Sequence, residues 1–342
     1  MVRTAILFGG RGPEHEISLQ SAATVLSHLP DLCHPLPIYI TKDGAWQYYP
    51  LGSFQIANNA LHSFVPPLPV SLSLEDGALT LGGEDSHPQA VLPLLHGTHG
   101  EDGRLAGFLE TAGIPFIGCG TLSGAVSMDK AFAKAYLSHF GIPTVPWHRV
   151  CLDEPITEER LALVEGSISY PIFVKPAQGG SSLGASCARD REGLRAALSA
   201  AHRFDSVALC ECCIEGREIE VAILDAATFT VSRPGEIDHR GFYDYRAKYE
   251  NNGARLLIPA PIPAALAERA RRLAERIFRL LGCRHLARVD FFCVGNDLYF
   301  NEINTLPGFT QTSMYPRLMA DAGYPLPRLL DALIASADAR GI

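Results

Sequence analysis

The sequence predicts an α/β protein of two or three domains. Its 342 residues exceed the length at which a single hydrophobic core stops growing. A short apolar run, a glycine-rich turn and a helical pattern follow one another at the N-terminus, which is how an α/β domain begins. Near the C-terminus, apolar and polar residues alternate on both sides of a Gly-Asn-Asp turn, a pattern typical of a β-hairpin.

Composition narrows the class of protein. A hydrophobic content of 47% with 19% charged residues fits a globular chain, and the net charge of −8 argues against a non-specific nucleic-acid binder. No apolar run reaches the roughly 18 residues that cross a bilayer, so we expect no membrane partner. Nine cysteines, an odd number, fit a reducing compartment better than a disulfide framework, and we therefore expect a cytoplasmic location.

The first predicted unit comprises residues 1–120. It opens with a strand over residues 4–8, and buried segments follow at residues 90–95 and 114–118. A helix follows the first glycine-rich turn, and its apolar residues recur at helical spacing: Leu19, Ala22, Ala23, Leu26 and Leu29. The turn lacks the Gly-x-Gly-x-x-Gly pattern, so by itself it says little about function.

The second predicted unit comprises residues 121–214. Lys130 stands at the start of a helix, where a lysine is usually only a surface residue but can also bind phosphate. A strand over residues 170–176 contains Lys175 and runs into a glycine- and serine-rich loop. Such a loop presents many backbone N–H groups and can fold over phosphates, although an ordinary tight turn explains it equally well. It lacks the ending of a Walker loop.

Carboxylates flank the junction at the end of this unit. Residues 207–214 form a predicted buried strand, and Glu211 and Glu218 lie on either side of its end. One of them could accept a ribose hydroxyl, while the backbone from Cys212 to Ile214 could pair with an adenine edge.

The third predicted unit comprises residues 215–342. It begins with a strand over residues 218–224. Residues 229–259 are polar and lack clear periodicity, and a long segment of this kind in a compact protein is often a functional lid. A helix over residues 264–281 follows and ends at Gly282.

The hairpin of this unit carries the most specific chemistry. If its loop has three residues, Val294 pairs with Leu298. The same register places four polar side chains on one face in two opposed pairs: Asp290 with Glu302, and Arg288 with Asn304. Two carboxylates directly opposite each other destabilise a sheet unless a cation lies between them. Their oxygen ligands suit Mg²⁺, and the alternative is a solvated polar face.

Seven motifs together resemble the D-alanine–D-alanine ligase family of ATP-grasp ligases over essentially the whole chain. They are Gly9-Gly10 to Glu16-Ile17-Ser18, His96-Gly97-x-x-Gly100-Glu101-Asp102-Gly103, Ser127-Met128-Asp129-Lys130, Val174-Lys175-Pro176, Tyr243-Asp244-Tyr245-x-x-Lys248-Tyr249, Arg288-x-Asp290 and Asn301-Glu302-x-Asn304-Thr305-x-Pro307-Gly308-Phe309-Thr310. The resemblance implies a three-domain ATP-grasp fold with an N-terminal doubly wound α/β domain. It also implies a homodimer that binds ATP between the second and third domains.

The activity implied by the resemblance is the ATP-dependent joining of two D-alanines for peptidoglycan synthesis. ATP phosphorylates one D-alanine, and the amine of the second then attacks the acyl phosphate. Lys130, Lys175 and Arg288 are the matching cations, together with two Mg²⁺ ions that Mn²⁺ could replace. The matching metal ligands are Asp290, Glu302 and Asn304. Arg288 is thereby reassigned from a counter-charge of these carboxylates to a group that stabilises the transferring phosphate and the oxyanion.

The resemblance also implies substrate contacts. Glu14 receives the ammonium of the first D-alanine and forms a hydrogen-bonded triad with Ser181 and Tyr249. His96 lies near the substrate carboxylates, and the Gly308 N–H joins Arg288 at the oxyanion. The contacts to the carboxylate of the second substrate are Lys248 and Ser313.

Three alternatives differ in what the active site does. Relatives that join D-alanine to D-lactate or D-serine carry His or Phe at the position of Tyr249, so the tyrosine predicts D-alanine in both subsites. A degenerate nucleotide-binding protein would have lost metal or cation positions, and none is lost here. A ligase for another amino acid would differ in the Glu14 segment or in the lid.

Overall fold

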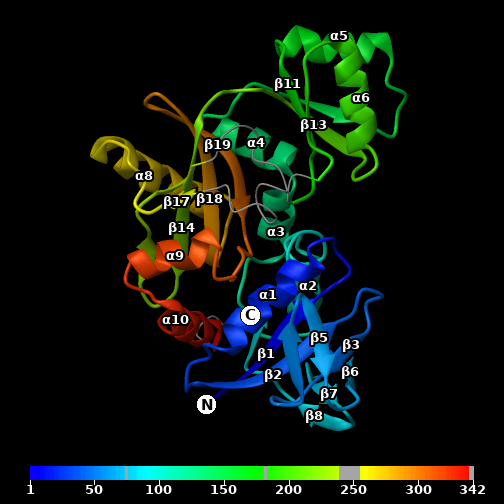
Figure 1. The fold of residues 1–342 in the computed structure, drawn as a ribbon, viewed down its shortest axis with the longest axis vertical. Coiled ribbons are helices and arrows are strands. Elements are labelled where there is room, and N and C mark those ends of the chain that lie inside the picture. Colours follow the sequence, from blue (N-terminus) through cyan, green and yellow to red (C-terminus); the bar gives the residue numbers. More distant parts are fainter. Residues whose placement is uncertain (74–75, 181–182, 239–254, 339–342) are drawn as a thin grey trace.

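Three main sheets organise the protein. A computed structural model describes residues 1–73, 76–180, 183–238 and 255–338. Its main sheets take their strands from residues 2–93, 147–212 and 217–304, one from each predicted unit (Figure 1). Among the helices of these residues, none has both the length and the apolar character needed to cross a membrane.

The N-terminal sheet has a parallel centre and an antiparallel extension. Strand β1 pairs in parallel with β2 on one side and β9 on the other. The remaining strands extend the sheet beyond β2 in antiparallel pairs, in the order β3, β6, β7, β8. The strands are β1 Val2–Gly9, β2 Cys33–Ile40, β3 Trp46–Tyr48, β6 Leu68–Leu72, β7 Leu79–Leu81, β8 Glu84–Ser86 and β9 Ala90–Pro93, beside a separate hairpin of β4 Phe54–Ala57 and β5 Ala60–Ser63.

Helices cover both faces of the parallel centre, as the predicted doubly wound arrangement requires. Successive side chains of β1 point to opposite faces. On one face, Phe8 belongs to the same core as Leu19 of α1 (His15–Leu26). On the other face, Leu7 belongs to a core with Leu105 and Leu109 of α2 (Arg104–Thr111).

The central sheet carries two helices on one face, and α4 (Lys130–His139) contacts its other face through Ala131. Its antiparallel order is β10 (Trp147–Cys151), β13 (Val207–Cys212), β11 (Ile172–Pro176), β12 (Ser186–Ala188). Helices α5 (Glu158–Ser167) and α6 (Arg191–Ala201) pack on the face that carries Val174 and Cys210. Lys175 and Glu211 therefore lie on the opposite face.

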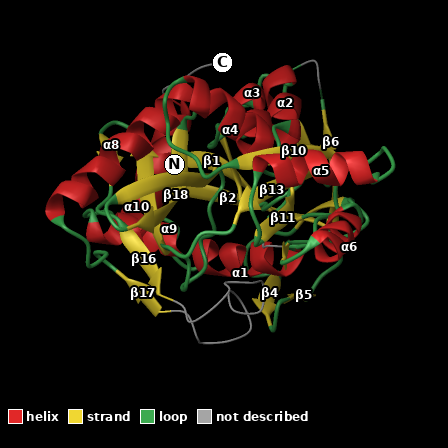
Figure 2. Ribbon diagram, turned by 90° about the horizontal axis from the view of Figure 1, so that it is seen from above, coloured by secondary structure: helices red, strands yellow, loops and turns green. Residues whose placement is uncertain are grey.

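The C-terminal sheet also has helices on both faces, and α9 (Met314–Asp321) packs against Ala222 and Leu224 of β14 on one of them. Helix α8 (Ala264–Leu280) packs on the face that carries Val221 and Val289, so Glu220, Arg288 and Asp290 point to the other face. Helix α8 and the pair α5 and α6 lie at opposite ends of the molecule (Figure 2). The strands run in the order β17 Arg255–Leu257, β16 Gly235–Asp238, β14 Arg217–Asp225, β18 His285–Val294, β19 Asp297–Asn304, with β15 Phe229–Val231 also paired to β14.

The expectation that residues 229–259 lack regular structure is wrong for the described part of that segment. Strands β15, β16 and β17 all fall within it, and each pairs in the C-terminal sheet. Each is only three or four residues long, too short for alternation to be visible in the sequence. The predicted lid itself falls largely on residues 239–254, which lie outside the described residues.

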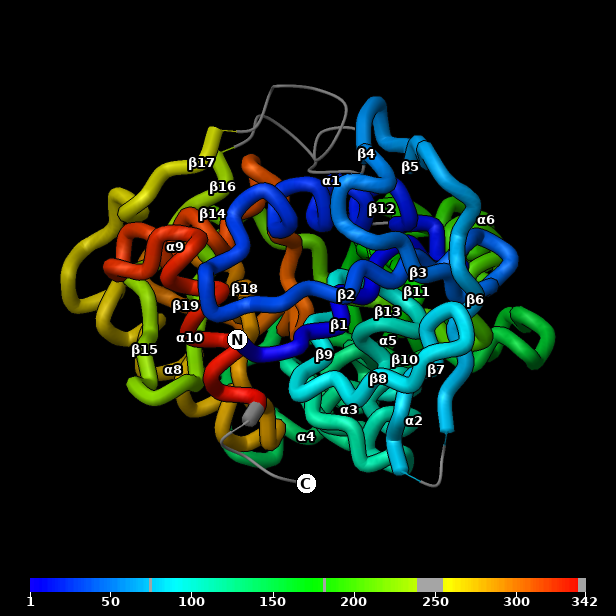
Figure 3. The backbone as a smooth tube through the Cα atoms, turned by 90° about the horizontal axis from the view of Figure 1, so that it is seen from below, coloured from blue at the N-terminus to red at the C-terminus, as the bar shows by residue number. Residues whose placement is uncertain are grey.

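Two further pairs of helices connect the sheets. Helices α3 (Thr121–Met128) and α4 (Lys130–His139) lead into the central unit, but Ala133 and Leu137 of α4 pack in the core of the C-terminal sheet. Helices α9 (Met314–Asp321) and α10 (Leu326–Asp338) share the core of α1 and β1, and α10 lies beside the N-terminus in Figure 3. The domain boundaries stay a prediction.

The register of the β18–β19 hairpin corrects one expectation and confirms another. Val294 pairs with Asp297 rather than Leu298, so the loop has two residues and not three. A β-bulge then changes the register, because Phe291 faces Phe300 whereas Asp290 faces Glu302. Asn301 is the extra residue. The expected opposition of Asp290 to Glu302 and of Arg288 to Asn304 is therefore correct, although the assumed loop was not.

Candidate active site

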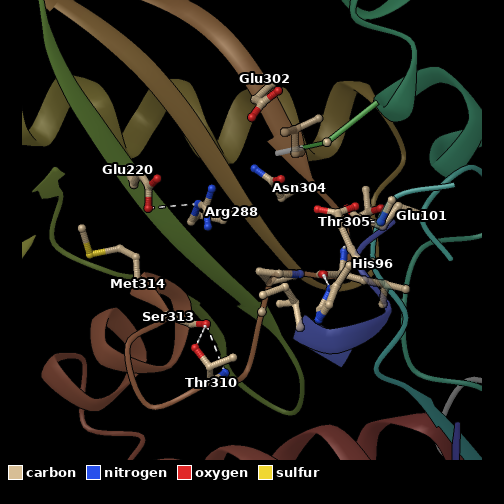
Figure 4. A pocket seen from close by; sticks show the side chains of 18 of the residues that line it. His96, Glu101, Glu220, Arg288, Glu302, Asn304, Thr305, Thr310, Ser313 and Met314 are labelled. Atoms are coloured by element: carbon tan, nitrogen blue, oxygen red, sulfur yellow. Dashed lines mark hydrogen bonds and ion pairs between the residues drawn. The ribbon is translucent and has the colours of Figure 1, made fainter. Parts of the chain in front are cut away.

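A cavity of about 540 Å³ lies where the three sheets meet. Its size is that of a typical small-molecule site. The side chains that line it come from both ends of the chain, as Figure 4 shows for His96 and Glu101 on one side and Arg288 and Ser313 on the other. The charged residues in the lining include four cations and four carboxylates: Lys130, Arg255, Arg288 and Arg317, and Glu14, Glu101, Glu220 and Glu302.

Arg288 occupies the centre of the C-terminal sheet. Its Nε and Nη2 donate to the two oxygens of Asp290 over 2.8 and 2.7 Å, and Nε lies 3.0 Å from Oε2 of Glu220 (Figure 4). Burial by itself disfavours the charged guanidinium, but the two carboxylates outweigh burial and raise the pKa of Arg288 well above its ordinary value. Arg288 is therefore the counter-charge of Asp290 and Glu220 in this structure. The resemblance had implied that it stabilises the phosphate and the oxyanion instead of pairing with the carboxylates.

Lys130 connects the glycine-rich loop to the hairpin. It begins α4, whose N-cap Asp129 accepts hydrogen bonds from the N–H groups of Ala131 and Phe132. Its Nζ donates to the carbonyl oxygen of Gly179 over 2.7 Å and lies 3.3 Å from Oε2 of Glu302. One ammonium thus reaches both the predicted phosphate-binding loop and a predicted metal ligand.

The predicted metal ligands suit Mg²⁺ that arrives with a nucleotide. Nδ2 of Asn304 donates to Oδ2 of Asp290 over 2.9 Å, which leaves the amide oxygen of Asn304 available as a ligand. Within the described part of the chain, no group of three or more His, Cys, Asp or Glu residues could hold a metal by itself. Mg²⁺ is usually bound by one or two carboxylates together with substrate phosphates, so the donor set of Asp290, Glu302 and Asn304 fits this mode.

Glu14 closes the N-terminal side of the cavity. It is buried at the N-terminus of α1, and its carboxylate lies against two glycines. A Cβ at Gly97 would lie 2.2 Å from Oε2 of Glu14, and one at Gly180 would lie 2.9 Å from Oε1. Any larger residue at either position would displace the carboxylate, which explains why both positions are glycine.

His96 is held by two elements that are distant in sequence. Its Nδ1 lies 3.1 Å from the carbonyl oxygen of Leu306, and its Nε2 lies 3.1 Å from the hydroxyl of Ser21. That hydroxyl also accepts from the N–H of Phe309 over 3.2 Å. His96 therefore fastens α1 and the 305–309 loop together at the rim of the cavity.

Glu101 is a partly buried acid within the sequence motif, and the resemblance assigned it no role. Its two oxygens accept from the N–H groups of Gly97 over 3.0 Å and Leu306 over 3.4 Å. Burial, followed by the nearby charge of Glu14, raises the pKa of Glu101 to about 7 despite these hydrogen bonds.

Gly308 and Ser313 form a tight loop before α9. A Cβ at Gly308 would lie 2.8 Å from Oγ of Ser313. That hydroxyl accepts from the N–H of Thr310 over 3.1 Å and lies 2.7 Å from its Oγ1 (Figure 4). Both residues line the cavity, and Figure 4 shows Ser313 across it from Glu101.

The structure corrects the role expected for Glu211. Its side chain is only 2% exposed, and its two oxygens lie 2.8 Å from Nζ of Lys134 and 2.7 Å from Nζ of Lys175. Burial would raise the pKa of Glu211, but the two ammonium groups outweigh burial and hold the pKa at about 2. A carboxylate enclosed in this way is not presented to a ribose hydroxyl. It is the counter-ion of the lysine predicted to bind phosphate.

Of the backbone groups expected to bind adenine in the hinge between β13 and β14, two are already hydrogen-bonded to other residues. The N–H groups of Cys212 and Cys213 donate to the carbonyl oxygens of Pro146 and Pro171 over 2.9 and 3.2 Å, so they cannot also bind a base. Within the described residues, the N–H of Ile214 makes no backbone hydrogen bond. Glu218, half-buried on β14, is the remaining carboxylate for a ribose.

Three predicted site residues, Ser181, Lys248 and Tyr249, lie outside the described residues. Sequence reasoning in turn missed Glu220, Lys134 and the role of Glu101. Glu220 lies opposite Asp290 on β14, and Lys134 follows Lys130 by one helical turn. The pairing of β14 with β18 places Glu220 at this site. The packing of α4 against the hairpin places Lys134 there, where it donates to the carbonyl oxygen of Phe300.

The fold and the site together define the class of protein: it is an ATP-grasp ligase. Two antiparallel sheets turn their polar faces toward one another, and the cavity beside them combines cations with a carboxylate-bearing hairpin. Family models described as D-ala D-ala ligase N-terminus and C-terminus match residues 3–119 and 136–335. The chain belongs to the D-alanine–D-alanine ligase family.

Individual relatives agree over nearly the whole length. The D-alanine–D-alanine ligase of Caldicellulosiruptor bescii is 42% identical over 350 residues, which cover 98% of this chain and 95% of the relative. The solved structure of the VanG D-Ala:D-Ser ligase from Enterococcus faecalis is 33% identical with a TM-score of 0.86, and the match covers 98% of this chain and 99% of that one. The D-alanine–D-alanine ligase from Coxiella burnetii is 30% identical with a TM-score of 0.85, covering 99% and 94%.

Proposed function

We propose that this protein joins two D-alanines to D-alanyl-D-alanine at the expense of ATP, releasing ADP and phosphate. The dipeptide would supply peptidoglycan precursor synthesis. The observation that carries the proposal is the cavity in which Glu14, Lys130, Arg288 and Glu302 converge from separate elements. It offers a carboxylate for an amino group at one end and cations for phosphates at the other.

The first step joins two anions and therefore needs positive charge. A carboxylate oxygen of the first D-alanine attacks the γ-phosphorus of ATP, the bond to ADP breaks, and an acyl phosphate forms. Glu14 binds the ammonium of this D-alanine, in a triad proposed to include Ser181 and Tyr249. Lys130 and Lys175 bind the phosphates of ATP, because their ammonium groups lie beside the glycine-rich loop and the hairpin.

The metal site is part of the same proposal. Asp290, Glu302 and Asn304 would hold Mg²⁺, and the resemblance implies two ions. When bound, Mg²⁺ neutralises charge on the phosphates during transfer. On the nucleotide, the N–H of Ile214 and the carboxylate of Glu218 are the proposed contacts to the base and the ribose.

The second step forms the peptide bond. The amine of the second D-alanine attacks the acyl carbon, loses a proton, and phosphate leaves. The developing oxyanion is stabilised by the guanidinium of Arg288 and the N–H of Gly308, while Ser313 and Lys248 bind the carboxylate of the second substrate. His96 keeps the 305–309 loop in place through Leu306. The predicted lid, which falls largely on residues outside the described ones, would protect the acyl phosphate from water.

D-serine as the second substrate is the competing proposal. It is favoured by the VanG relative, which is named as a D-Ala:D-Ser ligase. Curated relatives of higher identity carry the name D-alanine–D-alanine ligase, and Tyr249 is the residue predicted for D-alanine in both subsites. We therefore propose D-alanine at both positions. The homodimer and the cytoplasmic location stay predictions.

Product analysis tests this function directly. The protein is incubated with ATP, Mg²⁺ and D-alanine, alone or with equal D-serine or D-lactate, and phosphate release is measured along with the products. L-alanine serves as the control. We expect D-alanyl-D-alanine as the main product in every mixture that contains D-alanine. A main product that contains D-serine or D-lactate at neutral pH would refute the choice of second substrate, and absence of phosphate release would refute the activity.

A further inference from the structure

A buried cluster of charges lies directly beneath the cavity, and the proposed mechanism uses only one of its members. The cluster consists of Lys134, Glu211 and Lys175. Lys134 is fully buried and Glu211 is nearly so. Long charged side chains are almost never buried completely unless they are paired, because desolvation costs several kcal/mol per ion.

Helix geometry separates the tasks of the two lysines on α4. Lys130 and Lys134 are four residues apart and share one face of the helix. Lys130 lines the cavity, whereas Lys134 points below it, where Nζ meets Oε1 of Glu211 over 2.8 Å. Lys134 is fully buried and does not line the cavity, so any effect it has on a ligand there would act through its partners.

The first partner leads to the phosphate-binding lysine. Oε2 of Glu211 lies 2.7 Å from Nζ of Lys175, so one carboxylate is shared between two ammonium groups. Without Lys134, Lys175 would be the only counter-ion left for a buried carboxylate and would be drawn more tightly onto it. Lys134 thus weakens the hold of Glu211 on Lys175 and leaves that ammonium available to a nucleotide.

The second partner leads to the metal hairpin. Nζ of Lys134 donates to the carbonyl oxygen of Phe300 over 3.0 Å, and Nζ of Lys175 donates to Oδ1 of Asn301 over 3.2 Å. These two residues form the β-bulge that sets Glu302 opposite Asp290. β19 is the edge strand of its sheet, and the N–H of Phe300 donates away from β18 to the carbonyl oxygen of Pro143 over 2.8 Å. The carbonyl group of Phe300 faces the same way and needs a donor when it is buried. Lys134 supplies that donor.

We infer that Lys134 is a positioning residue for the magnesium–nucleotide complex: it adjusts Lys175 through Glu211 and fixes the bulge that aims Glu302 into the cavity. The inference rests on the proposed function for the identity of the ligand. The arrangement of charges among Lys134, Glu211 and Lys175 is observed in the structure and does not depend on the proposed function. The cluster carries one net positive charge, from two lysines and one glutamate.

Nucleotide binding tests the positioning role without turnover. Affinity for ADP is measured by titration calorimetry on the full chain, with and without Mg²⁺, for wild type, Lys134→Met and the control Lys42→Met. Lys42 carries the same substitution on the surface, where its side chain is 67% exposed and pairs with Glu16. We expect Lys134→Met to weaken ADP binding in Mg²⁺ about 10- to 100-fold, the usual cost of losing a residue behind a metal ligand, and Lys42→Met to change it less than about twofold.

Thermal unfolding tests the shared charge independently of any ligand. Glu211→Gln leaves two ammonium groups buried without a carboxylate, whereas the double variant Glu211→Gln/Lys134→Met restores the wild-type net charge. We expect a higher Tm for the double variant than for Glu211→Gln alone. The double variant also serves for calorimetry if Lys134→Met does not fold.

The outcomes separate the two proposals. Wild-type affinity for ADP in Lys134→Met would overturn the positioning role, and equal loss of affinity with and without Mg²⁺ would overturn the part of it that acts through the bulge and Glu302. A double variant no more stable than Glu211→Gln would overturn the shared charge. Failure of the wild type to bind ADP would refute the proposed function instead, and the comparison of Tm values would still decide about the cluster.

Discussion

Glu101 gives the sharpest test of the electrostatics of this site. Its pKa is raised from 4.5 to about 7, chiefly by burial. At about 1.4 kcal/mol for each pH unit, the ionised carboxylate costs the folded state about 3 kcal/mol. The substitution Glu101→Gln removes this charge and preserves the size of the side chain.

Whether the free energy of unfolding rises or falls with pH depends on which state, folded or unfolded, holds the proton of Glu101. Between pH 4.5 and about 7, the folded protein binds a proton at Glu101 that the unfolded chain does not, so the free energy of unfolding rises as pH falls through this window. Above pH 7 the cost of ionisation is fully present. Below pH 4.5 both states are protonated, and the group has no further effect.

Glu101→Gln also loses one acceptor. The amide oxygen can still accept from the N–H of Gly97, but the amide nitrogen cannot accept from the N–H of Leu306. That hydrogen bond is long at 3.4 Å, and we assign its loss a cost of about 1 kcal/mol. The variant should therefore be about 2 kcal/mol more stable than wild type at pH 8 and equal or slightly less stable at pH 5.

Denaturant unfolding at the two pH values measures this difference. Comparing variant with wild type cancels the other titrating groups, and Glu154→Gln, whose side chain is 69% exposed, controls for the loss of a surface charge. If the variant is less stable than wild type at pH 8, or if the difference is the same at both pH values, burial does not control this carboxyl as we have argued.

Three further substitutions test the proposed roles. Arg288→Ala should keep ATP binding but lower kcat by roughly 10²–10³, because it removes an oxyanion donor. It should also lower the free energy of unfolding by about 3–5 kcal/mol, because Asp290 and Glu220 lose their buried counter-charge. Glu302→Gln should raise the Mg²⁺ concentration for half-maximal rate by about 10- to 100-fold. Gly308→Ala should lower kcat/KM for D-alanine by about 10²-fold, because the new methyl group displaces the loop at Ser313.

Controls and contrary results differ for each substitution. Arg272→Ala removes an exposed arginine from α8 and should leave turnover unchanged. Near-normal turnover in Arg288→Ala would exclude its role at the oxyanion. An unchanged Mg²⁺ requirement in Glu302→Gln would exclude this carboxylate as a ligand, and wild-type kinetics in Gly308→Ala would show that the loop yields without consequence.

The hairpin shows how far local sequence reasoning reaches. Alternation of polar and apolar residues identified both strands and the face that bears Arg288 and Asp290, because the period of a strand is fixed by its backbone. The loop length was wrong, and the opposition of Asp290 to Glu302 was right only because a bulge at Asn301 compensates for it. The position of a bulge depends on which side chains pack on each face of the sheet, and no local sequence pattern predicted it.

Glu211 shows where such reasoning ends. The sequence places it correctly on a buried strand, and from there a carboxylate next to a hinge suggested a ribose contact. Its partners Lys134 and Lys175 come from a helix and a neighbouring strand, so their meeting depends on how α4 packs against two sheets. The same holds for Glu220, whose pairing with Arg288 follows from the order of strands in the sheet.

The sequence by itself determined the fold class, several of the strands and helices, and the motifs by which the family is recognised. These features depend on periodicity and spacing, which are properties of neighbouring residues. Only the tertiary structure decided which charges meet. Ion pairs such as Lys134 with Glu211 and Arg288 with Glu220 join residues about 70 positions apart, and their geometry is fixed by the packing of whole sheets.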